Sequence, residues 1–294
     1  MNIYNKAASL LPMRLYSEIL AAPENLRLKS EEIRLRAGQA PSLLCEGVEY
    51  RLGNELCVSQ DDLDTVLEKA TGASVHSYEN SIANAYISVD GGIRIGICGT
   101  AVMDCGTVCG IRSLSSLAIR IPHDISDCAD ELYSEHFSGR FKNTLLISPP
   151  GCGKTTLMRS LIKNLSYAGM RVSVADERGE LGAVYEGEAQ YDLGPCTDIM
   201  SFAPKSEAAL MMLRAMNTQV LAVDEISASK DVRALIEAFG CGINILASAH
   251  ASGVSDLYKR PVYRELMNAK MFEYIIIISA EHGIRNYVVK EINQ

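Results

Sequence analysis

The second half of the chain alternates short apolar runs with longer segments of helical periodicity. Apolar residues in a short run bounded by turn residues predict a buried strand, and apolar residues three and four apart predict a helix. Because the strands are apolar at nearly every position, we expect a parallel sheet with helices on both faces. The predicted strands are 144–148, 171–175, 219–223 and 244–248, the predicted helices are 155–167, 206–216, 230–239 and 256–268, and 273–279 with 285–292 form a predicted closing hairpin.

The first half has a different, mixed pattern. Residues 32–36 and 86–89 alternate in polarity, and Asp90-Gly91-Gly92 predicts a turn into a further strand over 93–98. Ser59 opens a predicted helix that runs to Lys69, with Asp62 as its capping partner. A polar stretch between Pro122 and Arg140 follows. We therefore predict a smaller α+β N-terminal domain over 1–138 and an α/β domain over 139–294.

Composition and charge narrow the class of protein. With 48% hydrophobic and 22% charged residues the chain has an ordinary globular composition. Its longest apolar run is Ala208–Leu213, whereas a spanning helix needs about 20 residues, so we expect no direct membrane insertion and a cytoplasmic protein. The net charge is −8 and no run of four Lys or Arg occurs, which disfavours nucleic acid as a partner. The nine cysteines include no C-x-x-C pair, so neither a disulfide framework nor a zinc site is indicated.

Residues 148–156, Ser-Pro-Pro-Gly-Cys-Gly-Lys-Thr-Thr, lie between a predicted strand and a predicted helix, which is the setting of a phosphate-binding loop. Backbone N–H groups of such a loop surround phosphate at the positive end of the helix. Lys154 would bridge the β- and γ-phosphates of a nucleotide, and the Thr155 hydroxyl would bind Mg²⁺. The pattern G-x-x-x-x-G-K-[ST] has Gly where this chain has Ser148, a residue small enough to fit. The predicted nucleotide-binding residues are Pro150, Gly151, Cys152, Gly153, Lys154, Thr155 and Thr156.

Acidic residues follow two other predicted strands. Asp224 and Glu225 come directly after 219–223, where a buried carboxylate needs a cation or hydrogen bonds. Asp224 is a candidate Mg²⁺ ligand beside Thr155, and Glu225 is a candidate general base for an attacking water. The alternative is that both acids only cap the next helix. Because a strand separates the loop strand from 219–223, the pattern favours a P-loop NTPase with a RecA/ASCE-type parallel sheet, a branch that consists mostly of ATPases.

Further polar residues fall at strand ends. Asp176, Glu177 and Glu180 follow 171–175, and His250 follows 244–248. The carboxyl ends of parallel strands meet at one edge of a sheet, so we expect these side chains to converge with Glu225 there. The alternatives are an exposed, solvated turn for the three acids and a capped or hydrogen-bonded loop position for His250.

Four of these segments resemble the secretion and pilus-retraction ATPases of type II and type IV systems. They are the phosphate-binding loop, DERGEL (176–181), AVDEI (222–226) and ASAHA (247–251). The resemblance implies a hexameric ring, a water-activating role for Glu180 and γ-phosphate sensing by His250. The segment LAIRIPH (117–123), with Arg120, is similar to the strand that ends the N-terminal domain of that family. Those ATPases usually have Gly where this chain has Asp224, so Glu225 and Glu180 both stay candidates for the general base.

Additional segments resemble a family of stage III sporulation ATPases over nearly the whole chain. They are EEIRLRAGQAP (31–41), GGIRIGICGTAV (91–102), APKSEAALMMLRAM (203–216) and YKRP (258–261). This resemblance implies a mother-cell protein that sits at the membrane through membrane-anchored sporulation channel proteins. In a ring, an arginine from a neighbouring subunit stabilises charge on the γ-phosphate. The candidates are Arg112 and Arg120, then Arg94, Arg214 and Arg260.

We therefore expect an ATP-hydrolysing, Mg²⁺-dependent motor that powers or assembles a membrane channel complex during endospore formation. Three alternatives stay open at this point. A nucleotide-gated scaffold would bind ATP with little turnover, and a DNA-dependent RecA-like ATPase would be stimulated by single-stranded DNA. A small-molecule phosphotransferase would need a lid with clustered arginines after the loop helix.

Overall fold

A computed structural model describes residues 2–53, 56–72, 85–122, 127–281 and 284–292. The chain divides into two compact units, Met1–His123 and Asp124–Gln294. The division falls inside the predicted polar stretch, but residues 124–138, which the sequence analysis assigned to the first domain, group with the second unit. The reason is helix α6 (Asp130–His136), whose Leu132 is buried in the same core as Leu157 and Leu161 of helix α7 (Lys154–Tyr167).

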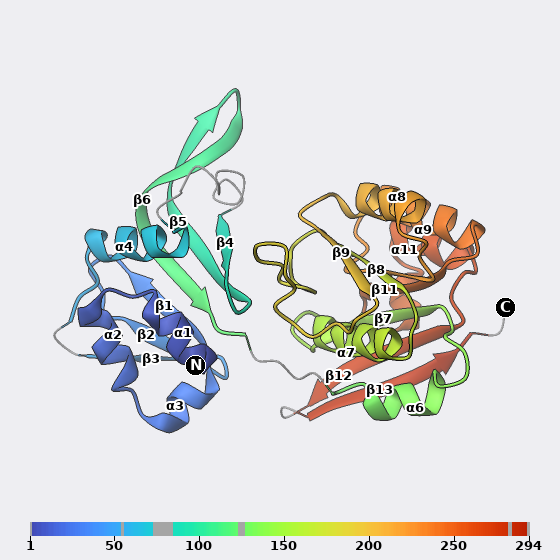
Figure 1. Ribbon diagram of the computed structural model, residues 1–294, viewed down its shortest axis with the longest axis horizontal. Coiled ribbons are helices and arrows are strands. Elements are labelled where there is room, and N and C mark those ends of the chain that lie inside the picture. Colours follow the sequence, from blue (N-terminus) through green and yellow to red (C-terminus); the bar gives the residue numbers. More distant parts are fainter. Residues whose placement is uncertain (1, 54–55, 73–84, 123–126, 282–283, 293–294) are drawn as a thin grey trace. The chain divides into compact units, whose positions relative to one another are not determined.

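The first unit is an antiparallel sheet covered by helices (Figure 1). The sheet has the strand order β3-β2-β1-β6-β5-β4. Its strands are β1 (Ser30–Arg36), β2 (Ser42–Cys45), β3 (Val48–Arg51), β4 (Tyr86–Val89), β5 (Ile93–Asp104) and β6 (Thr107–Arg120). Its helices are α1 (Ile3–Ser9), α2 (Met13–Leu20), α3 (Glu24–Lys29) and α4 (Gln60–Ala70).

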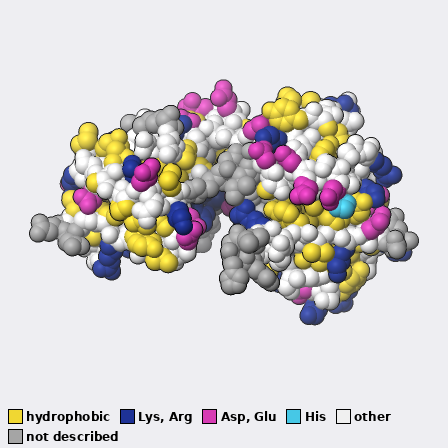
Figure 2. Space-filling view, turned by 90° about the horizontal axis from the view of Figure 1, so that it is seen from below, with side chains coloured by type: hydrophobic (Ala, Val, Ile, Leu, Met, Phe, Trp, Pro, Cys, Tyr) yellow, Lys and Arg dark blue, Asp and Glu magenta, His cyan; other side chains and the backbone are white. Residues whose placement is uncertain are grey.

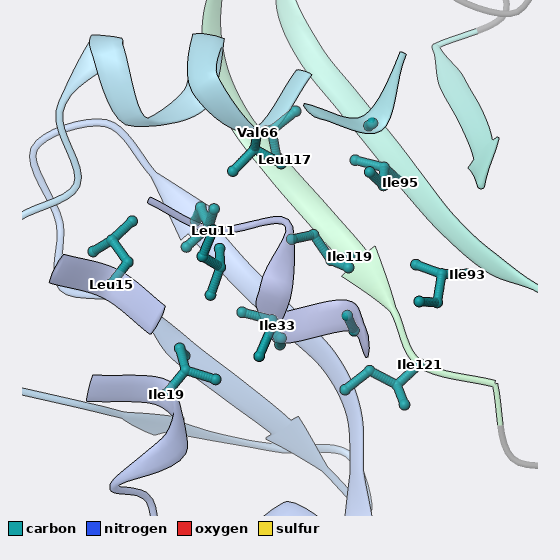
Figure 3. Close-up of a cluster of buried hydrophobic side chains, with 14 of the residues drawn as sticks. Leu11, Leu15, Ile19, Ile33, Val66, Ile93, Ile95, Leu117, Ile119 and Ile121 are labelled. Atoms are coloured by element: carbon teal, nitrogen blue, oxygen red, sulfur yellow. The ribbon is translucent and has the colours of Figure 1, made fainter. Parts of the chain in front are cut away.

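Alternate strand residues and the inner faces of the helices form the core of this unit. Figure 3 shows Ile33, Ile95 and Ile119 of the sheet in one hydrophobic cluster with Leu15 of α2 and Val66 of α4. The N-terminus of α4 has the predicted capping box, because the Ser59 hydroxyl accepts from the Asp62 N–H and the Asp62 carboxylate accepts from the Ser59 N–H. Strand β5 continues beyond the predicted 93–98, and its last seven residues are exposed.

The second unit contains a seven-stranded sheet with the order β13-β12-β7-β11-β10-β8-β9. Each neighbouring pair is parallel except β12 with β13, which form the predicted antiparallel hairpin. The mixed α/β fold with a parallel sheet is therefore confirmed. The strands are β7 (Thr144–Ser148), β8 (Val172–Asp176), β9 (Thr197–Ser201), β10 (Val220–Val223), β11 (Asn244–His250), β12 (Tyr274–Glu281) and β13 (Ile284–Glu291).

Helices cover both faces of this sheet (Figure 1). On β7, Leu146 packs in one core with Leu157 of α7, whereas its neighbours Leu145 and Ile147 pack in the other core with Leu235. Side chains of a strand point alternately to opposite faces, so a strand that is apolar at every position is buried on both. The helices of the second core are α8 (Lys205–Ala215), α9 (Ser229–Gly240), α10 (Val254–Leu257) and α11 (Pro261–Asn268).

Two features of this unit differ from the sequence prediction. The predicted helix over 256–268 is two helices, because Pro261 starts α11 and lacks the N–H that a continuous helix would use. Strand β9 was not predicted, and all five of its residues are only partly buried. A half-exposed edge strand lacks the apolar run that marks the central ones.

The described surface is chemically mixed. On the face shown in Figure 2, Lys and Arg side chains stand singly or in small groups among acidic and apolar ones. Among the described residues, the structure has no helix both long and apolar enough to cross a membrane.

Candidate functional site

The phosphate-binding loop connects β7 to α7 in the predicted order. Strand β7 ends at Ser148, and α7 begins at Lys154. Gly151 and Gly153 have φ values of +78° and +87°, a region that residues with a side chain rarely adopt. The side chain of Ser148 is buried, and its hydroxyl donates to the Pro149 carbonyl oxygen at 2.7 Å. Ser148 therefore fits at the position where the motif usually has glycine.

Lys154 points into the site and contacts the predicted histidine. Its side chain is only 7% exposed, and burial lowers its pKa from the ordinary lysine value. The distance from Lys154 Nζ to His250 Nδ1 is 3.0 Å. An ammonium group only donates, so Nδ1 accepts and a neutral ring carries its proton on Nε2. That Nε2 faces the carboxylate of Glu225 at 3.4 Å.

Glu225 lies at the centre of a charged cluster. One carboxylate oxygen faces His250, and the other accepts from Arg178 Nη1 at 3.1 Å. The residue has φ +46°, which for a non-glycine residue stores strain of about 1 kcal/mol or more. Such strained positions cluster at functional sites because the surrounding structure has to hold them.

Two neighbours hold the backbone of Glu225 in this conformation. Its N–H donates to Ser248 Oγ at 2.9 Å, and its carbonyl oxygen accepts from Lys205 Nζ at 2.7 Å. The Ser248 hydroxyl in turn donates to Asp224 Oδ1 at 2.7 Å. Strand β11 and helix α8 thus fix both acids that follow β10.

These groups surround one cavity of about 400 Å³. The structure brings together the loop, both acids after β10, His250 and Glu180. The oxygen donors of Thr155 and Asp224 are of the kind that Mg²⁺ prefers, and phosphate and water would complete its six ligands. The residues around the cavity are Pro150, Gly151, Gly153, Lys154, Thr155, Thr156, Arg178, Glu180, Asp224, Glu225, His250 and Arg285.

Four predicted site residues do not line this cavity. Glu177 pairs instead with Lys205 at 3.0 Å, and the Cys152 side chain packs against the α7 side of the core. Arg112 and Arg120 lie on β6 in the first unit. Arg120 Nε donates to a Glu32 oxygen at 3.1 Å, so its guanidinium already has an acidic partner.

Four further residues belong to the site although the sequence did not point to them. Arg178 and Ser248 lie inside the segments DERGEL and ASAHA, so those segments were the available signal. Lys205 is the first residue of α8 and is almost fully buried. This burial is seen in the folded structure and could not be read from the sequence. Arg285 lies near the start of β13, the last strand of the chain, and no sequence pattern marked it.

Asp176 organises the backbone of the acidic segment after β8. Its carboxylate accepts from the N–H groups of Glu180, Leu181 and Gly182 at 2.8, 3.1 and 2.9 Å. Burial raises the pKa of this carboxyl, and the three N–H donors oppose that shift. Asp176 thereby sets the path of the segment that carries Glu180.

Replacing Asp176 with alanine should lower the free energy of unfolding by about 2–4 kcal/mol, because three N–H donors lose their acceptor. Since the folded-state pKa of Asp176 is raised, its contribution is fully present below the unfolded-state pKa and declines as pH rises through the folded-state pKa. Denaturant unfolding at several pH values measures both effects. The control is Asp198→Ala on the neighbouring strand β9. Equal stability of the two variants would contradict this role for Asp176.

A family model and a known relative both match this protein over nearly its whole length. A family model described as "Sporulation stage III, protein AA" matches residues 5–290. The "Stage III sporulation protein AA" of Bacillus subtilis (strain 168) is 31% identical over 285 residues, which are 95% of this chain and 92% of that protein.

Solved structures show the same fold at low identity. The pilus retraction motor PilT with bound ADP has a TM-score of 0.62 and 17% identity, covering 94% of this chain and 83% of PilT. The ATPase DotB of Legionella pneumophila has a TM-score of 0.59 and 13% identity, covering 98% of this chain and 78% of DotB. At these identities the similarity concerns the fold, which is shared with P-loop ATPases.

Proposed function

Because the chain belongs to the sporulation stage III protein AA family, we propose that it is an ATP-hydrolysing motor that powers or assembles a membrane channel complex during endospore formation. The observation that carries the proposal is the single cavity that joins the phosphate-binding loop to Asp224, Glu225 and His250. DotB is described as an ATPase and PilT as a motor with bound ADP, and both share this fold.

In this proposal the loop binds the triphosphate of ATP. The backbone N–H groups of 151–156 and the start of α7 hold the phosphates, and Lys154 bridges the β- and γ-phosphates. Thr155 and Asp224 would hold Mg²⁺, which would supply positive charge to neutralise the phosphates. On binding, Lys154 exchanges its contact with His250 for phosphate oxygens.

Glu225 is the proposed general base. It takes a proton from water as the water oxygen bonds to the γ-phosphorus and the bond from that phosphorus to the ADP oxygen breaks. His250 contacts both Lys154 and Glu225, and these contacts support the proposal that it senses the γ-phosphate. Glu180 borders the same cavity and is the alternative base. Glu177, through its ion pair with Lys205, positions the backbone of Glu225.

The proposed assembly is a hexameric ring with a RecA/ASCE-type ATPase domain in each chain. An arginine of a neighbouring chain would then approach the γ-phosphate, and Arg112 and Arg120 are the candidates. Arg120 would have to leave Glu32 to do so. The ring would act from the cytoplasm on membrane-anchored channel proteins of the mother cell.

Phosphate release from ATP tests this function directly. We expect turnover with Mg²⁺, its loss when EDTA removes the metal, and recovery when Mg²⁺ is restored, because Mg²⁺ shields the γ-phosphate charge. Release no faster than in protein-free buffer would favour a nucleotide-gated scaffold. Strong stimulation by single-stranded DNA would favour a RecA-like DNA-dependent ATPase.

A further inference from the structure

Arg285 reaches the phosphate-binding loop from the C-terminal hairpin. It lies at the start of β13, opposite Ala280 of β12, and β12 runs parallel to β7. The carboxyl ends of β7 and β12 therefore lie at the same edge of the sheet, and Arg285, the second residue of β13, pairs with Ala280 near the carboxyl end of β12. This topology places the residue beside the loop although more than a hundred residues separate them in sequence.

The guanidinium of Arg285 packs against Gly153. A Cβ atom added to Gly153 would lie 2.6 Å from Arg285 Nε and 2.9 Å from Arg285 Cζ, which is closer than such atoms approach. Gly153 is required for its φ of +87°, and the end of the Arg285 side chain occupies the space beside its Cα. The arginine also lines the same cavity as Lys154 and Thr156.

Arg285 brings an unneutralised positive charge to this cavity. Among the described residues it has neither a hydrogen bond nor an ion pair, whereas Lys154 contacts His250 and Arg178 pairs with Glu225. A half-buried guanidinium without an anionic partner favours an anionic ligand, because charge-assisted hydrogen bonds to phosphate are strong and often bidentate.

The strand order decides which end of a nucleotide this charge meets. Strand β7 lies between β12 and β11, so the loop is flanked by Arg285 on one side and by His250 and Glu225 on the other. A triphosphate whose γ-phosphate lies at Glu225 and His250 extends its α- and β-phosphates away from them. We propose that Arg285 binds the phosphates that ATP and ADP share, and so determines nucleotide affinity without taking part in hydrolysis. This inference rests on the proposed nucleotide binding.

The test compares Arg285→Gln with Lys290→Gln, which removes a cation from the same strand at an exposed position. Equilibrium binding of Mg–ADP, Mg–ATP and inorganic tripolyphosphate is measured on the full chain, together with kcat and KM for ATP. We expect Arg285→Gln to weaken all three ligands by a similar factor of about ten, as the loss of one charged hydrogen bond implies. KM should rise while kcat stays nearly constant, and Arg285→Lys should restore part of the affinity. Lys290→Gln should behave like wild type.

Several results would overturn the inference. If Arg285→Gln weakens ATP binding but not ADP binding, Arg285 contacts the γ-phosphate instead. If tripolyphosphate binding is unchanged while nucleotide binding weakens, Arg285 contacts the base or sugar. If the affinity for all three ligands is unchanged, Arg285 does not contact the bound nucleotide. Equal melting temperatures of the variants exclude misfolding as the cause of a loss. If wild type binds none of the ligands, the proposed function itself fails, which is distinct from failure of Arg285→Gln alone.

Discussion

Replacing Lys154 with alanine should weaken Mg–ATP binding and lower kcat/KM for ATP by at least about 30-fold. The side chain is almost fully buried at the loop, so its charge acts on the phosphates with little screening by water. Loss of one partner of a buried charge pair costs about 2–5 kcal/mol, which corresponds to this factor. Calorimetric titration gives the affinity, and phosphate release gives kcat/KM.

Lys163→Ala is the matched control for this variant. Lys163 lies on the same helix α7 but pairs with Asp127 and Asp192, outside the cavity. It should bind and hydrolyse ATP like wild type. If Lys154→Ala also keeps wild-type affinity and turnover, residues 148–156 do not hold the triphosphate.

Replacing Glu225 with glutamine should lower kcat by about 10²- to 10⁴-fold while ATP affinity stays the same or increases. Glutamine keeps the shape of the side chain but cannot take a proton from water. It also removes a negative charge that would repel the γ-phosphate, so ATP should accumulate on the protein. Single-turnover phosphate release together with equilibrium ATP binding separates the two effects.

Comparison with Glu180→Gln decides between the two candidate bases. Glu237→Gln on α9, an exposed position away from the cavity, serves as the control and should keep full activity. We expect the loss of turnover to be much larger for Glu225→Gln than for Glu180→Gln, since Glu225 also contacts His250. The opposite order would transfer the role of base to Glu180. Equal, slow release by wild type and both variants would contradict hydrolysis at this site.

The central part of the fold follows from local sequence patterns. Strands β7, β8, β10 and β11 are buried at nearly every position, so their apolar runs mark them clearly. Strand β9 is half exposed, and its Thr-Asp start carries no such run. Helices α10 and α11 share one helical pattern, which only Pro261 interrupts. A half-exposed strand and a break at one residue change the hydrophobic pattern only slightly, so the sequence does not mark them clearly.

The candidate site was predictable wherever its residues follow a buried strand. Asp224, Glu225 and His250 lie at one sheet edge because the carboxyl ends of parallel strands meet there. Arg285 and Lys205 could not be identified in this way. Arg285 depends on the register of the last hairpin, and Lys205 depends on how α8 packs beside β10. The hairpin register and the packing of α8 are set by tertiary structure, and a local sequence pattern does not reveal them.

Calorimetric titration of the wild-type chain with Mg–ATP and Mg–ADP tests nucleotide binding by residues 148–156 most directly. We predict saturable binding of one nucleotide per chain, with a dissociation constant between about 1 μM and 1 mM, the range usual for enzyme substrates. Folded protein that gives no binding heat with either nucleotide at millimolar concentration, and no protection against thermal unfolding, would contradict the account.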